Sequence, residues 1–183
     1  MVRAVLDEDL DALRSRPVDP VAEQDVLVPE IPHWVYVGDT LLHVAAAALR
    51  PAPVQVLLER GVPVTARNRR GATALHYAAD TRPANHNWSP ERQRSVIELL
   101  VVAGAEVSAA DKGGVTALHR AVRARSPAAV EALLRSGADP HALTRKGSTP
   151  LDLTAWSTGA GGTAGTEDLR VEIQRLLRQA LDH

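Results

Sequence analysis

The sequence predicts an all-α solenoid of stacked helical units, on three observations. A motif built from Gly, Thr and Leu recurs four times along the 183 residues, with His in three of its copies, and a second segment with apolar residues at helical spacing follows each copy. The apolar residues are mainly Ala, Leu and Val, and Phe is absent. Because internal repetition is the signature of repeat architectures and small side chains let helices approach closely, we expect a thin stack of short helices.

The N-terminal region, residues 1–20, is expected to cap this stack. Leu6, Leu10 and Leu13 mark one amphipathic helix over about residues 3–16. We interpret it as a degenerate capping repeat. The next segment, 21–37, contains Pro29 and Pro32, which argue against a helix, so we expect an extended finger in the form of a hairpin.

Four units follow, which we place at residues 38–70, 71–113, 114–146 and 147–183. Their threonines are spaced 33, 43 and 33 residues apart, at Thr40, Thr73, Thr116 and Thr149. Thr is a good helix N-cap, and the residue three positions later occupies the reciprocal position of a capping box. The second helices of the first three units each end at a glycine, as a left-handed C-cap would.

Two of the units are longer than the others. The extra residues of the second unit lie in 81–89, and those of the fourth include the glycine-rich stretch 159–165. Both insertions fall between the two helices of a unit. They are either surface loops tolerated at little cost, or a shared accessory surface that includes Trp88.

The second motif copy reads Gly-Ala-Thr-Ala-Leu-His-Tyr-Ala over residues 71–78, and this pattern with its 33-residue period resembles the ankyrin repeat. The resemblance covers roughly residues 38–181. It implies one domain over 1–183, made of four ankyrin repeats plus the N-terminal cap, that binds another protein. The whole chain is similar to small bacterial ankyrin-repeat proteins, which implies an adaptor, a regulator of an enzyme, or an immunity-type inhibitor of a toxin.

The resemblance also implies where a partner binds: on the fingertips beside each glycine and on the residues at the end of each first helix, which line the concave face. The charged and tryptophan residues at these positions are Arg69, Arg70, Asp80, Lys112, Arg123, Arg145, Lys146 and Trp156. Six are basic and one is acidic, in a chain of net charge −1. This basic stripe favours an acidic protein partner. The alternative is ordinary exposed fingertip charge. Trp156 and Trp88 are expected to anchor the partner.

Three histidines recur once per unit, at His43, His76 and His119, and Asp152 ends the series. Equivalent helices in a stack lie roughly 10 Å apart, whereas zinc ligands lie about 2 Å from one centre. We therefore interpret these histidines as structural capping residues and expect neither a metal nor a cofactor.

The same residues also bear on other functions. The stretch 159–164 matches a dinucleotide-binding glycine pattern, but a helix is expected before it where that site needs a strand. The chain has no Cys and no triad pattern, so we expect no enzymatic activity. A small-ligand site or enzyme built on the glycine-rich loop is one alternative. A nucleic-acid site on the basic stripe is another, disfavoured by the net charge.

The composition indicates a soluble, cytoplasmic chain. Residues 1–10 lack the apolar run of a signal peptide, and the longest apolar run, 44–49, is too short to span a membrane. Nineteen of the 21 basic residues are Arg, which indicates a GC-rich bacterial genome. We expect a monomer.

Overall fold

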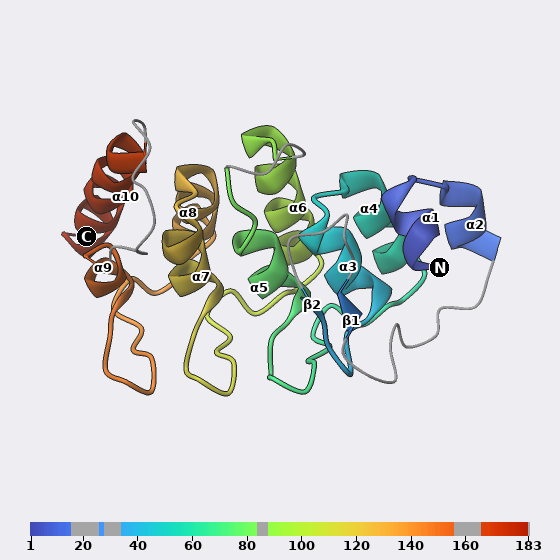
Figure 1. Cartoon of the computed structure of the whole chain (residues 1–183), viewed down its shortest axis with the longest axis horizontal. Helices are drawn as coiled ribbons and strands as arrows, with labels where there is room; N and C mark the ends of the chain where they lie inside the picture. Colours follow the sequence, from blue (N-terminus) through green and yellow to red (C-terminus); the bar gives the residue numbers. More distant parts are fainter. Residues whose placement is uncertain (16–25, 28–33, 84–87, 156–165, 183) are drawn as a thin grey trace.

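The computed structural model describes residues 1–15, 26–27, 34–83, 88–155 and 166–182 of the chain. The helices stack in chain order along the long axis of the molecule, with α1 and α2 at one end and α9 and α10 at the other (Figure 1). The predicted all-α repeat solenoid is confirmed.

Each unit of the stack contributes one helix to each of two layers. The first helices are α3 (Leu41–Ala47), α5 (Ala74–Ala79), α7 (Ala117–Ala124) and α9 (Pro150–Leu153). The second helices are α4 (Pro51–Glu59), α6 (Pro90–Val102), α8 (Pro127–Arg135) and α10 (Thr166–Leu181). Between units the chain descends into long fingers that project from the layer of first helices (Figure 1). Both insertions lie between the two helices of a unit, as the spacing predicts.

The N-terminal region differs from its prediction, because the single helix expected over 3–16 is two helices, α1 (Val2–Leu6) and α2 (Leu10–Ser15). Glu8 adopts a left-handed conformation with φ 55° and breaks the helix there. An Asp9 carboxylate oxygen then accepts the Ala12 N–H in the first turn of α2, a capping bond at 3.0 Å. The pair packs α1 on α3 and α2 on α4, as successive units do.

The segment after the N-terminal helices contains a small antiparallel ladder. Strand β1 (Val26–Leu27) pairs with β2 (Trp34–Val35), with Val26 opposite Val35 and Leu27 opposite Trp34. This pairing agrees with the extended hairpin that the proline spacing predicts.

The recurring histidines join neighbouring units. In each of α3, α5 and α7 the histidine Nδ1 accepts the backbone N–H of the capping threonine, at 3.1–3.2 Å. The other ring nitrogen, Nε2, lies 3.0–3.2 Å from a carbonyl oxygen of the next unit, at Ala72, Val115 and Ser148. A carbonyl only accepts, so Nε2 carries the proton and the ring is neutral. The capping interpretation is therefore confirmed, and each histidine also makes a bond between units.

The fourth unit shows why aspartate can end the series. An Asp152 carboxylate oxygen accepts the Thr149 N–H at 2.8 Å and reproduces the capping bond. An ionised carboxylate only accepts hydrogen bonds, so Asp152 cannot donate to a carbonyl of a following unit as a histidine Nε2–H does.

We expect Thr116→Ala to lower the free energy of unfolding by about 0.5–2 kcal/mol. The Thr116 hydroxyl accepts the His119 N–H at 3.4 Å and lies 2.9 Å from His119 Nδ1. Thr73, with the same contact to His76 at 2.9 Å, should behave alike. Urea denaturation measures the change, with Thr116→Ser as the control that retains the hydroxyl. Unchanged midpoints for both alanine variants would contradict the capping role.

Candidate functional site

A cleft of about 790 Å³ opens between the third and fourth units. Two fingertips, α7, the end of α9 and the start of α10 form its walls. The residues that line it are Lys112, Gly113, Val115, Val122, Arg123, Arg125, Thr144, Arg145, Lys146, Ser148, Leu153, Thr154, Arg170 and Ile173. Its volume lies within the range of roughly 300–1,000 Å³ that is typical of ligand pockets.

The fingertips of the cleft are held by their own turns. An Asp111 carboxylate oxygen accepts the N–H groups of Gly113 and Val115 at 2.7 and 3.1 Å. In the next finger, the Thr144 hydroxyl oxygen accepts the Ser148 N–H at 3.2 Å. These side-chain oxygens accept backbone N–H groups that would otherwise have no partner in the turn, and so they fix the shape of each finger.

Successive fingertips are also bonded to one another. The Lys112 N–H donates to the Arg70 carbonyl and the Arg145 N–H donates to the Gly113 carbonyl, both at 2.9 Å. The fingertip side chains of three units are therefore carried on one connected backbone surface.

The floor of the cleft is apolar. Val122 on α7 and Ile173 on α10 are 4% and 1% exposed and belong to the core. Val115 on the finger and Leu153 on α9 are half-buried. An apolar side chain that binds on this floor would gain about 25 cal/mol of favourable free energy for each Å² of apolar surface removed from water.

The rim of the cleft is cationic. Six basic residues line it: Lys112, Arg123, Arg125, Arg145, Lys146 and Arg170. No carboxylate is among the described residues that line it. The neighbouring sequence 156–165, which lies outside the described residues, contains no charged residue.

Four of these cations are exposed and gather around one cleft. Lys112, Arg123, Arg145 and Lys146 are exposed, and their side chains form no ion pair with any other residue that the structure describes. Several other arginines have acidic partners, among them Arg170 of the rim, which forms an ion pair with Glu167. Arg120, for example, lies 3.4 Å from Asp80 and 3.1 Å from Asp111. Since no carboxylate of the described ranges pairs with the four cations, the cleft carries a local positive potential although the chain is nearly neutral.

The structure brings together part of the predicted basic stripe. Lys112, Arg123, Arg145 and Lys146 share the cleft. Arg69 and Arg70 lie on the preceding fingertip, outside the cleft lining, with their guanidinium carbons 5.8 and 4.6 Å from the centre of the Tyr36 ring. At these distances they make cation–π contacts with that ring.

Asp80, which was expected to contact a partner, is partly buried and forms an ion pair with Arg120 at 3.4 Å. Trp88 is half-buried, and its indole N–H donates to Gln93 Oε1 at 2.8 Å. The same oxygen accepts the Ser126 hydroxyl at 2.6 Å, so Trp88 helps to tie the inserted loop to α6 and α8. It does not line the cleft. Trp156 and the glycine-rich stretch 159–165 lie outside the described residues.

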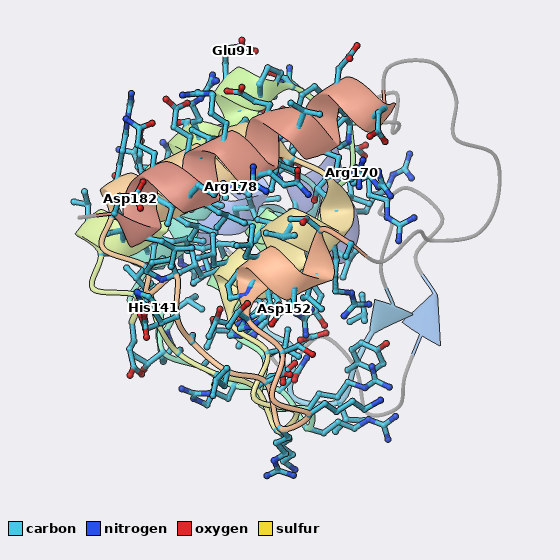
Figure 2. The ribbon with its side chains drawn as sticks, turned by 90° about the vertical axis from the view of Figure 1, so that its left-hand side faces the viewer. Glu91, His141, Asp152, Arg170, Arg178 and Asp182 are labelled. Atoms are coloured by element: carbon cyan, nitrogen blue, oxygen red, sulfur yellow. The ribbon has the colours of Figure 1, made fainter. Side chains whose placement is uncertain are left out.

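The sequence reasoning missed two cleft residues, Arg125 and Arg170. Arg125 is the C-cap of α7 and adopts a left-handed conformation with φ 57°, which no residue pattern in the sequence predicts. Arg170 precedes buried Ile173 by three positions, which places both on one face of α10. That spacing is a readable signal. In Figure 2, Arg170 lies at one end of α10, while Arg178 and Asp182 lie towards the other.

Within the described ranges, no group of three or more His, Cys, Asp or Glu side chains is arranged to hold a metal ion. In the same part of the chain, every helix is too short or too polar to cross a membrane.

Comparison with known proteins identifies the repeats. Residues 70–112 match the family model for the ankyrin repeat, and residues 100–153 match the model for ankyrin repeats in many copies. No curated protein sequence matches the chain. Ankyrin repeats generally mediate protein–protein interaction, and proteins built from them are typically binding scaffolds without enzymatic activity. With its repeated capping boxes, its stacked helix pairs and these two matches, the chain belongs to the ankyrin-repeat family.

Proposed function

We propose that this protein binds an acidic region of a partner protein on its concave face, at the cleft between the third and fourth repeats. The observation that carries the proposal is the group of four exposed cations without an ionic partner, Lys112, Arg123, Arg145 and Lys146. A cluster of like charges favours binding of a partner region that carries the opposite charge. Through this binding the protein acts as a monomeric adaptor, regulator or inhibitor.

The shape of the cleft favours a protein over a nucleic acid. A protein that binds a nucleic acid needs cations spaced along the phosphate backbone of the strand. A single strand is also held by its bases, which stack on aromatic side chains. Here the cations surround one apolar floor, and none of the described cleft residues is aromatic. A rim of charge around an apolar centre is the usual arrangement of a protein interface.

Charge reversal in the cleft tests the proposal. We expect Arg123→Glu with Arg145→Glu to reduce partner capture at least about tenfold, because two attractive charges become repulsive. Capture from a lysate of the native source by the immobilised full chain, with quantitative mass spectrometry, measures the loss.

The matched control reverses two exposed arginines outside the cleft, Arg92 on α6 and Arg178 on α10. Its change in net charge is identical, so any difference between the two double variants comes from position. If both variants retain the same partners, or lose them equally while still folded, the cleft is not the binding site.

A further inference from the structure

The cleft has two chemically distinct parts, and together they restrict the segment that can fill it. An acidic surface patch would need only the cations. The half-buried floor residues Val115 and Leu153 would then remain in contact with water beneath it. Ligand pockets combine an apolar lining with a few placed polar groups, the first supplying affinity and the second orientation.

We infer that the cleft receives an extended acidic segment of the partner in which one apolar side chain, flanked by carboxylates, lies on this floor. The inference rests on the proposed function and specifies the occupant of the same site. Its basis is complementarity in both charge and polarity to residues of the third and fourth repeats.

The cations come from two parts of the fold. Lys112, Arg145 and Lys146 belong to the fingertips, whereas Arg123 and Arg125 belong to the end of α7 and Arg170 to the start of α10. An extended chain presents successive side chains to alternate sides. Residues i−2, i and i+2 therefore share one face, so carboxylates two positions before and two positions after the apolar residue can face the cleft with it and reach both groups. Guanidinium groups bind carboxylates through paired hydrogen bonds.

The same arrangement argues against a single compact anion. A phosphate or sulfate is held by donors that converge on one point, such as successive backbone N–H groups of a nest or a helix N-terminus. The fingertip N–H groups of Lys112 and Arg145 are instead bonded to the carbonyls of neighbouring fingers. The cleft, of about 790 Å³, instead presents separated cations beside an apolar floor.

Defined peptides test the inference with the full-length protein. The probes are two short fluorescent peptides rich in Asp and Glu, identical except for a central residue that is Leu in one and Ser in the other. We expect the Leu peptide to bind about tenfold more tightly, because burying the leucine side chain removes apolar surface from water. Fluorescence anisotropy at several salt concentrations measures both affinities.

Two protein variants separate the floor from the rim. Val115→Thr replaces one floor methyl group by a hydroxyl of similar size and should weaken the Leu peptide alone. Arg123→Glu with Arg145→Glu should abolish binding of both peptides, while Arg92→Glu with Arg178→Glu leaves both affinities unchanged. Thermal melts of every variant establish that it is folded.

The outcomes distinguish this inference from the proposed function. Equal affinity for the two peptides, both lost on charge reversal in the cleft, overturns the apolar anchor and leaves the acidic-partner proposal standing. Tighter binding of a phosphoserine peptide without leucine, or of a DNA duplex, also overturns the inference. If neither peptide binds and cleft reversal leaves partner capture intact, both are wrong.

Discussion

Replacing Gly114 with alanine is expected to lower the free energy of unfolding by about 3 kcal/mol or more. Gly114 has a φ of 74°, which costs a residue with a side chain roughly 1–2 kcal/mol. An added Cβ would also lie 2.7 Å from the Arg145 nitrogen and 3.0 Å from the Thr144 carbonyl carbon. Both atoms are backbone, so the neighbouring finger must move, and the hydrogen bond from Arg145 to Gly113 is strained or lost.

Gly147 provides the matched control. It has almost the same φ, 75°, but nothing lies within 4 Å of the Cβ that alanine would add. We therefore expect Gly147→Ala to cost only the backbone contribution, roughly 1–2 kcal/mol. Urea denaturation of the two variants isolates the effect of the close approach between fingers. Equal losses of stability would show that the fingers can separate without cost.

Acidification is expected to destabilise the protein between pH 6.5 and about 4. Burial lowers the pKa of His43, His76 and His119, and for His76 the pKa falls from 6.5 to about 4. Above pH 6.5 the rings are neutral in both the folded and the unfolded chain, so their contribution to stability is complete. As the pH falls below 6.5, the unfolded chain binds protons that the folded chain resists, and unfolding becomes more favourable.

For His76 alone the loss amounts to about 3 kcal/mol by pH 4. Protonation would also place an N–H on Nδ1, facing the Thr73 N–H that it now accepts. Urea melts between pH 7.5 and pH 5 measure the slope. His76→Gln should be less stable at pH 7.5 but should lose less stability on acidification. His141→Gln, a change at an exposed ring, is the control. A wild-type stability independent of pH over this range would contradict the neutral capping rings.

Local patterns predicted most of the fold because local physics produces it. Thr at an N-cap with His or Asp three residues on, Pro in the first turn of α8 after Ser126, and glycine after α4, α6 and α8 each act within a few residues of chain. The same reasoning failed at residues 3–16. There the apolar spacing continues through the acidic turn, and it carried no sign that Glu8 would adopt a left-handed conformation.

The binding residues were predicted less completely because their roles depend on neighbours from other repeats. Lys112, Arg123, Arg145 and Lys146 could be placed on one surface from the repeat period. The repeat period does not show whether a charged side chain is already engaged in an ion pair with another repeat. Asp80 and Arg120 are 40 positions apart in the sequence, yet they form an ion pair across two repeats. Trp88 likewise bonds to Gln93, which also holds Ser126 of the next repeat.

The sequence by itself determined the number of repeats, their capping chemistry and the orientation that repeats from one unit to the next, since these depend on contacts within a turn or a fixed period. Only the tertiary structure decided that a cleft exists between the third and fourth repeats. Its apolar floor joins Val122 of α7 to Ile173 of α10, and Arg170 belongs to its rim from the start of α10. Such a cavity depends on how far apart two packed units leave their side chains, and that distance is set by contacts between residues remote in the chain.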